Sequence, residues 1–320
     1  MYVLELVGTD EEFAAYEARM AAVEVESLGP GLATARSLSD RFTDLAFTHR
    51  ASDLVGTCEA GIEDARTLLK AATIDRTGTA AVRAVDVRGT TGVDTQAAER
   101  ALGSVLVDRG LAIDLESPDH ELRALFAGDT CALGWLHAET DRDFADRQPG
   151  ERPFFQPGSM APDLARALAN IAGARPGAAV LDPMCGTGGI LLEAGLVGAR
   201  VVGMDVQAKM VAGARENLGA YLDGPWDVLR GDTSSLPLAD GTVDAVVFDA
   251  PYGRQSKIRG ELNRLVADAL REAPRCVVVG DRPWAQPAHE AGWQTEAVFD
   301  RRVHRSLTRY VVVLTRRGDG

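Results

Sequence analysis

The chain has 320 residues, with 47 acidic and 34 basic side chains and a net charge of −13. A chain of this length predicts two domains, each large enough to bury a hydrophobic core. No apolar run approaches the length of a membrane span, and the first residues lack the basic flank of a signal peptide. The four cysteines are widely separated and show no metal-ligand spacing, so we expect reduced thiols, no metal site and a cytoplasmic protein.

The negative charge comes from the first half of the chain. Residues 1–150 contain 27 acidic and 14 basic side chains, a difference of −13, whereas residues 151–320 contain 20 of each. Only three of the basic residues are lysines. This composition resembles that of halophilic proteins, whose carboxylates keep the surface hydrated in concentrated salt. An acidic protein from a GC-rich genome would also favour Arg over Lys.

Strand and helix patterns alternate along the N-terminal half, which predicts an α/β region over residues 1–140. A polar, turn-forming segment with several prolines and glycines follows and predicts a linker over residues 141–159. Residues 160–320 would then form the second domain. The expected elements of the first half are strand 2–7, helix 11–25, strand 45–48, helix 59–71, strand 80–87, helix 95–109, and strands 112–115, 121–127 and 131–137.

The second half repeats the alternation with more apolar strands. An amphipathic helix is expected over residues 161–174, and three strands each end in or lead to an aspartate: Asp182, Asp205 and Asp232. Open α/β sheets bind ligands at the carboxyl ends of their strands, so these three side chains are candidate ligand contacts. The expected strands are 178–181, 200–206, 227–230, 243–248 and 276–279, followed by a hairpin of residues 293–304 and 307–315.

The turn after Asp182 is rich in glycine and leads into an expected helix over residues 190–197. Such a turn lets backbone N–H groups approach a ligand closely. It fits the dinucleotide fingerprint poorly, because Leu191 stands where a small residue is needed. A carboxylate just before the turn is a poor neighbour for a pyrophosphate and a suitable acceptor for an ammonium group. Asp205 could accept from two ribose hydroxyls and Asp232 from an adenine amine.

These residues resemble the motifs of class I S-adenosylmethionine-dependent methyltransferases. The resemblance implies a Rossmann-like C-terminal domain with a seven-stranded mixed sheet whose last strand is antiparallel. It also implies S-adenosylmethionine as co-substrate and no metal. The residues that would bind it are Asp182, Met184, Gly186, Gly188, Asp205, Asp232 and Asp249.

A second motif, Asp249-Ala250-Pro251-Tyr252, indicates the acceptor. It resembles the (Asp/Asn/Ser)-Pro-Pro-(Tyr/Phe/Trp) signature of enzymes that methylate amines conjugated to a planar group, although Ala250 replaces a proline. The resemblance implies that Asp249 and the carbonyl of residue 250 accept the two amine hydrogens while Tyr252 stacks on the planar group. Enzymes that methylate carbon 5 of pyrimidines carry a cysteine where this chain has Tyr252, so covalent carbon methylation is disfavoured.

The order of an accessory α/β domain, a linker and this catalytic domain resembles the THUMP-containing archaeal tRNA guanine-10 N2-methyltransferases. Residues 152–160 are similar to that family's Arg-x-Pro-Phe-x-x-Pro-Gly-x-Met segment. The resemblance implies that residues 1–140 form ferredoxin-like and THUMP parts that bind tRNA, and that the second domain methylates guanine N2 once or twice. Some relatives work with a small activator subunit.

The basic residues of the second half are candidate RNA contacts. Arg254, Lys257 and Arg259 follow the acceptor motif, and a guanine flipped into the site would bring its flanking phosphates close to these three side chains. The final hairpin carries a further basic group: Arg301, Arg302, Arg305, Arg309, Arg316 and Arg317. The candidate RNA-binding residues are Phe154, Phe155, Arg254, Lys257 and Arg259.

Other functions fit part of the pattern. The same chemistry could act on another guanosine in RNA, on adenine N6 or on a protein glutamine. The THUMP-like half favours RNA, and Asp249 fits guanine better than the Asn common in those other groups. A non-catalytic RNA-binding scaffold is the alternative outside the enzymes, and the intact Asp182, Asp205, Asp249 and Tyr252 weigh against it.

Overall fold

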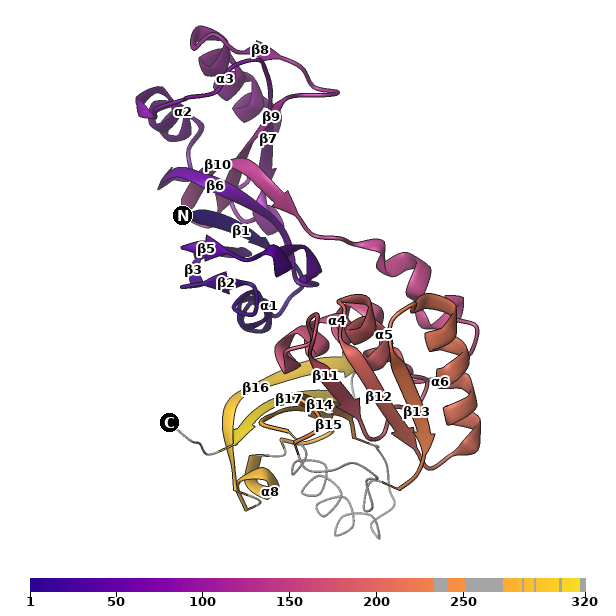
Figure 1. The fold of residues 1–320 in the computed structure, drawn as a ribbon. Helices are drawn as coiled ribbons and strands as arrows, with labels where there is room; N and C mark the ends of the chain where they lie inside the picture. The colour runs from indigo at the N-terminus through magenta and orange to yellow at the C-terminus, as the bar shows by residue number, and fades with distance from the viewer. Residues whose placement is uncertain (233–240, 251–272, 284, 291, 305–306, 317–320) are drawn as a thin grey trace. The chain divides into compact units, whose positions relative to one another are not determined.

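The structure is a computed structural model, and it describes residues 1–232, 241–250, 273–283, 285–290, 292–304 and 307–316. The chain divides into two compact units, Met1–Asp141 and Arg142–Gly320. Each unit contains its own β-sheet (Figure 1). None of the described helices is long and apolar enough to cross a membrane.

The first unit is built on an eight-stranded sheet with the strand order β3-β4-β1-β6-β10-β9-β7-β8. A short pair, β2 and β5, lies outside that sheet. The strands are β1 (Tyr2–Leu6), β2 (Ala22–Val23), β3 (Glu26–Gly29), β4 (Leu32–Ala35), β5 (Ser37–Leu38), β6 (Thr48–Glu59), β7 (Thr79–Asp86), β8 (Ala112–Ile113), β9 (His120–Ala127) and β10 (Thr130–Glu139). The helices are α1 (Glu11–Ala18), α2 (Ile62–Ala71) and α3 (Thr95–Asp108), with 3₁₀ turns at Asp40–Asp44 and Val87–Gly89.

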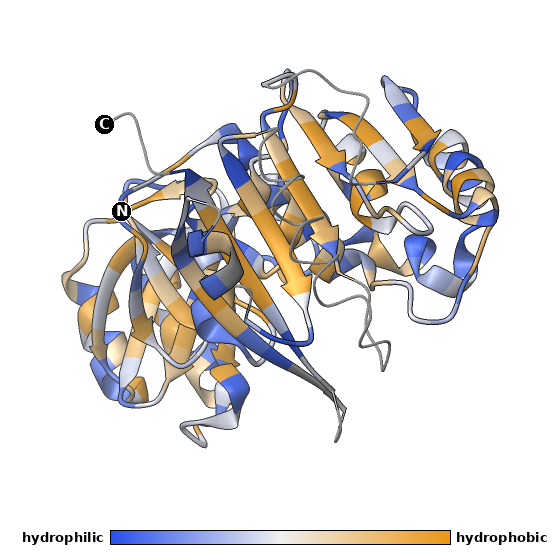
Figure 2. Ribbon diagram, turned by 90° about the horizontal axis from the view of Figure 1, so that it is seen from below, coloured by the Kyte–Doolittle hydropathy of each residue, from blue (hydrophilic) through white to orange (hydrophobic). Residues whose placement is uncertain are grey.

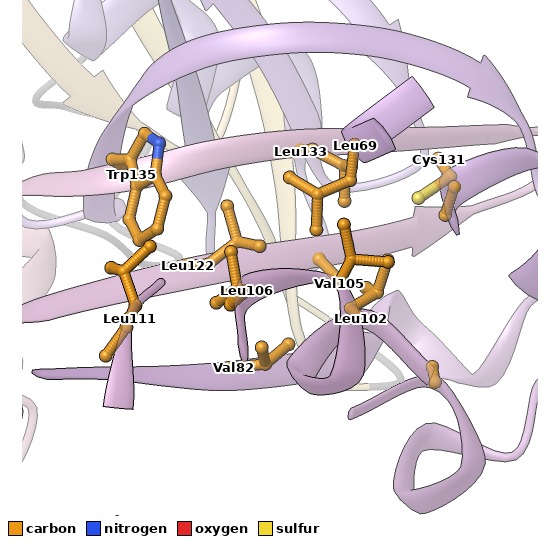
Figure 3. Packing of buried hydrophobic residues seen from close by; sticks show 14 of the residues in the cluster. Leu69, Val82, Leu102, Val105, Leu106, Leu111, Leu122, Cys131, Leu133 and Trp135 are labelled. Carbon is orange, nitrogen blue, oxygen red and sulfur yellow. The ribbon is translucent and has the colours of Figure 1, made fainter. Parts of the chain in front are cut away.

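The largest core of this unit lies between the sheet and the helices α2 and α3. Asp94 caps α3 by accepting from the backbone N–H of Ala97, and α3 then buries Leu102, Val105 and Leu106, which recur at helical spacing. Figure 3 shows these side chains packed against Leu122 and other residues of the strands. The helix expected over residues 95–109 is thus present as α3.

Two expectations for the first unit were wrong. The helix that begins at Glu11 ends at Ala18, not at residue 25. The strand expected at residues 45–48 is a buried loop, because the backbone N–H groups of Ala46 and Phe47 donate to the fully buried carboxylate of Glu17 at 2.8 and 2.7 Å. Backbone groups that find a side-chain partner need no neighbouring strand. The strand starts at Thr48 instead and continues through β6 to Glu59.

The second unit contains a seven-stranded sheet with the order β13-β12-β11-β14-β15-β17-β16. The strands are β11 (Ala179–Asp182), β12 (Arg200–Asp205), β13 (Trp226–Arg230), β14 (Ala245–Asp249), β15 (Arg275–Gly280), β16 (Trp293–His304) and β17 (Leu307–Arg316). The helices are α4 (Pro162–Ala172), α5 (Gly189–Leu196), α6 (Ala208–Tyr221) and α8 (Ala285–Glu290), with 3₁₀ turns η3 (Asp143–Arg147) and η4 (Pro149–Glu151).

Strands β11 to β15 run parallel, and β17 is antiparallel to β15 and to β16. Helices α4, α5 and α6 pack in that order, α4 to α5 and α5 to α6, and contact the parallel strands. Strands β11, β12, β14 and β15 are mostly hydrophobic and buried along their length (Figure 2), as is typical of parallel strands inside a sheet, whereas the edge strand β13 is mixed. The expected α/β class, with a seven-stranded mixed sheet and an antiparallel last strand, is confirmed.

The strand order places the switch point of the sheet between β11 and β14. The chain moves from β11 outward through β12 to β13 and then returns to the other side of β11 as β14. Ligands of open α/β sheets bind at such a point, beyond the carboxyl ends of the strands. Asp182 ends β11 and Asp249 ends β14, so these two carboxylates flank it.

Candidate active site

The loop after β11 begins with a carboxylate held inside the protein. The Asp182 side chain is 2 % exposed, and its Oδ1 accepts from the backbone N–H of Met184 at 3.0 Å. Gly188 then starts α5 with a φ of 78°, which glycine adopts without strain. Gly203 of β12 leaves room for this loop and for α5, since a Cβ there would lie 3.1 Å from Cys185 Sγ and 2.5 Å from the Leu191 side chain.

Asp205, at the end of β12, holds the same loop from the other side. Its Oδ2 accepts from the backbone N–H of Gly186 at 3.1 Å, and its Oδ1 accepts from the backbone N–H of Gln207 at 2.8 Å. Each carboxylate oxygen retains a second lone pair that a ligand hydroxyl could use. Asp232 lies two residues beyond β13 and is exposed.

Negative charge gathers around Asp182. The pKa of its carboxyl is raised well above the ordinary value, because burial removes water from it and because Asp249 and Asp205 add negative charge nearby. The hydrogen bond from Met184 opposes this shift and does not cancel it. A cationic ligand would relieve the repulsion, whereas an anionic ligand would increase it. The electrostatics therefore match an ammonium or sulfonium group.

A cavity lies beside Asp182 and Asp249. One wall is the segment from Gln156 to Met160, which precedes α4, and the opposite wall is the loop after β11 with the first turn of α5. Met210 of α6 and Asp249 of β14 complete the described lining. The residues of the second wall are Asp182, Met184, Cys185, Gly186, Thr187, Gly189 and Ile190. Asp182 and Asp249 thus face one cavity, although they lie far apart in the sequence.

The first wall belongs to a segment that we call the strap, residues 152–160. Its Phe154 is held by the fully buried Asn217 of α6, which accepts from the Phe154 N–H at 2.8 Å and donates to the Phe154 carbonyl at 3.0 Å. The same Asn217 amide donates to the Thr187 carbonyl at 2.9 Å. Asn217 therefore joins the strap to the loop after β11. The Phe154 ring packs on Gly213, where a Cβ would lie 2.0 Å from it.

A buried ion-pair cluster holds the chain just before the strap. Glu193 of α5 is fully buried and accepts from Arg147 Nε at 2.9 Å and from Arg166 Nη2 at 2.8 Å. The Arg147 carbonyl in turn accepts from Arg152 Nε, the first residue of the strap, at 2.9 Å. The segment expected to be a linker is thus packed as part of the second unit from Arg142 onward.

The acceptor motif is described in part. Asp249 lines the cavity, and the buried Ala250 donates its N–H to the Val279 carbonyl at 2.8 Å. Pro251 and Tyr252 lie outside the described residues. The candidate RNA contacts Arg254, Lys257 and Arg259 lie outside them as well.

The two candidate aromatic RNA contacts differ in their surroundings. Phe154 is half-buried against α6, whereas Phe155 is 52 % exposed. Phe154 therefore has a packing role that the sequence did not indicate. Phe155 is the one of the two whose ring is open to a partner.

Comparison with known proteins places the chain in a family. The RMKL-like methyltransferase domain family (UPF0020) matches residues 149–312. The tRNA (guanine(10)-N2)-dimethyltransferase of Methanothermobacter thermautotrophicus is 36% identical over 285 residues, which are 85% of this chain and 83% of that protein. The enzyme of the same name from Methanocaldococcus jannaschii is 32% identical over 75% of this chain and 71% of its own length. The chain belongs to the archaeal tRNA (guanine(10)-N2)-dimethyltransferase family.

The fold agrees with that membership. The crystal structure of TrmN from Thermus thermophilus superposes with a TM-score of 0.51 and 24% sequence identity, over 98% of this chain and 99% of that one. The family resemblance that we inferred from the motifs is confirmed by the family model and by the two archaeal relatives.

Several residues of this tRNA dimethyltransferase family member were not identified from the sequence as site residues. Residues 156–159 of the strap were assigned to a linker, and no role was expected for Met160 or Met210, although all of them line the cavity. Glu193 did leave a signal, because it is a charged residue among apolar neighbours on a helix and so needs a buried partner. Asn217 follows Arg215 and Glu216, so nothing in its local sequence indicated that it is buried. Arg309 was grouped with the exposed arginines of the hairpin, although its Nη2 lies 3.5 Å from Asp249 Oδ2.

Proposed function

We propose that the chain transfers methyl groups from S-adenosylmethionine to the exocyclic N2 amine of a guanosine in tRNA, at position 10 and once or twice. The observation that carries the proposal is the meeting of Asp182 and Asp249 at one cavity. Residues of a donor motif and of an amine-acceptor motif thereby face each other. The two archaeal relatives named above, which match 85% and 75% of this chain, carry this activity in their names.

The donor side of the cavity suits a cationic ligand. S-adenosylmethionine carries an ammonium and a sulfonium, and binding such charges beside Asp182 would offset the cost of its buried carboxylate. We propose that Met184, Gly186 and Gly188 shape the loop around this ligand. We further propose that Asp205 accepts from the ribose hydroxyls and that the exposed Asp232 lies near the adenine.

The acceptor side would act on an amine whose lone pair is delocalised into the guanine ring. Asp249 and the carbonyl of Ala250 would accept the two N–H groups and hold the nitrogen for in-line attack. As the nitrogen bonds to the methyl carbon, the carbon–sulfur bond breaks and its electron pair stays on sulfur. The nitrogen then loses a proton, for which Asp249 is the adjacent acceptor. Pro251 and Tyr252 would complete this side.

The first unit would bind the tRNA. Its excess of acidic residues makes general phosphate attraction weak, so binding would depend on shape, stacking and a few arginines. Because the target guanine is paired and stacked in tRNA, it must flip out of the helix at a cost of a few kcal/mol. A cytoplasmic location goes with a tRNA substrate, and fractionation of the source cells would test it.

Methyl transfer from labelled S-adenosylmethionine to unmodified tRNA transcripts, with nucleoside analysis, tests the proposal. We expect N2-methylguanosine and N2,N2-dimethylguanosine, and no product when guanine 10 is replaced. Asp249→Ala should abolish turnover and leave donor binding measurable, whereas a scaffold would keep its function. N6-methyladenosine or labelled protein would instead identify a different acceptor.

A small activator subunit, expected from the resemblance, is a separate proposal. It predicts that the purified chain binds S-adenosylmethionine but needs a second protein for turnover. Full activity of the purified chain alone would contradict it.

A further inference from the structure

Arg309 approaches the reacting end of the cavity from the last strand of the sheet. Asp249 on β14 pairs with Val279 on β15, and Val279 pairs with Val311 on β17. Arg309 precedes Val311 by two residues, so the two side chains lie on the same face of β17. Because these three strands are neighbours, that face also carries Asp249. The antiparallel direction of β17 thus brings an arginine to the carboxyl end of a parallel strand.

The contact is an ion pair in a partly enclosed place. Arg309 Nη2 lies 3.5 Å from Asp249 Oδ2, and the side chains are 13% and 23% exposed. An arginine that binds RNA phosphates should present its guanidinium to solvent in the free protein. Arg309 instead directs it at the carboxylate that lines the cavity. The geometry therefore separates Arg309 from the RNA-contact role suggested by its basic neighbours on the hairpin.

We propose that Arg309 is a positioning residue for methyl transfer, which fixes the orientation of the Asp249 carboxylate and holds it as the anion that accepts the guanine N–H. This inference rests on the proposed function. A planar guanidinium restricts rotation of a carboxylate more than a point charge does. The carboxylate must meet the amine within a fraction of an ångström, and misplacement by about 1 Å costs roughly 100-fold in rate.

The role predicts a particular pattern of kinetics. Arg309→Ala should lower kcat by about 10- to 100-fold, because the carboxylate loses its orientation. The KM for tRNA and the affinity for S-adenosylmethionine should change by less than about twofold, since the groups that bind both substrates stay in place. Arg309→Lys should recover part of the lost kcat, because it restores the charge without the planar group. A residue that only supports the fold would not give this partial recovery at unchanged KM.

The control is Arg200→Ala. Arg200 begins β12, at the opposite end of the parallel strands from Asp249, and its side chain is 59% exposed beside Asp227. We expect its kcat to stay within about twofold of the wild type. If Arg309 acted through RNA phosphates, Arg309→Ala would raise KM at unchanged kcat. That result would overturn the inference.

A double-mutant cycle with Asp249→Asn tests whether Arg309 acts through Asp249. Single-turnover rates with saturating donor and tRNA supply the four values. If Arg309 works only by positioning the carboxylate, Arg309→Lys should add less than about twofold to the loss caused by Asp249→Asn. Fully additive losses would overturn the inference, and so would wild-type kcat in Arg309→Lys and Arg309→Ala. Failure of the wild-type chain to methylate guanosine N2 would instead refute the proposed function itself.

Discussion

Loss of the Glu193 carboxylate should destabilise the second unit strongly. Glu193 is fully buried and is shared by Arg147 and Arg166, whose side chains are 5% and 7% exposed. Removing one partner of a buried ion pair leaves an uncompensated charge and costs about 3–5 kcal/mol. Arg147 keeps a second carboxylate, Asp143, at 2.6 Å, so the main loss falls on Arg166. We therefore expect the lower end of that range for Glu193→Gln, about 3 kcal/mol.

Thermal and urea unfolding of the full chain would measure the effect. For a unit of this size, about 3 kcal/mol corresponds to a fall in Tm of roughly 6–12 °C. The control is Asp227→Asn, which breaks the pair between Arg200 and Asp227, with side chains 59% and 61% exposed at 3.7 Å. That exposed pair should contribute less than about 1 kcal/mol.

A compensating variant sharpens the test. Replacing Glu193 and Arg166 together by Met removes both buried charges of that pair and should regain much of the stability lost by Glu193→Gln. If Glu193→Gln unfolded at the same urea concentration as Asp227→Asn, the cluster would not carry the stability assigned to it. The same conclusion would follow if the paired Met variant were less stable than Glu193→Gln.

Three further changes have expected outcomes. Asp182→Asn should abolish donor binding and should raise the stability of the fold near neutral pH. The pKa of Asp182 is higher in the folded than in the unfolded state, so the stability of the wild type is greatest below the unfolded pKa, where the carboxyl is protonated in both states, and falls as the pH rises through the folded pKa. Tm measured from pH 3 to pH 8 would show it, and a variant less stable than the wild type at pH 7 would contradict it. Gly213→Ala should lower the free energy of unfolding by about 1–3 kcal/mol and weaken donor binding, because the new Cβ displaces the strap. Gly219→Ala on the same helix should be neutral or stabilising, because a Cβ there would lie 3.6 Å from its nearest neighbour. Equal urea midpoints for the two variants would refute this prediction. Glu17→Gln should destabilise the first unit by about 2–3 kcal/mol, because an amide cannot accept both backbone N–H groups that the carboxylate accepts, and an unchanged urea midpoint would contradict it.

The sequence could predict most of what depends on local pattern. Most of the parallel strands are short apolar runs, so their positions could be predicted from the local sequence. An aspartate at the end of such a strand indicated the ligand-binding edge of the sheet. The helix expected over residues 95–109 is likewise found, as α3. Boundaries were less predictable where a side chain replaced a strand partner, as Glu17 does for the loop before β6.

Only the tertiary structure decided which distant residues meet. The strap carries an ordinary loop composition, and nothing in it shows that Asn217 will hold it against the loop after β11. Cys58 and Cys131, widely separated in the chain, are direct partners across β6 and β10. Arg309 looks like any other arginine of a basic hairpin until the antiparallel last strand places it beside Asp249. The pattern of apolar and polar residues in a segment indicates which of its faces is buried. Which segments pair with one another depends on strand order and register, and these are properties of the whole fold.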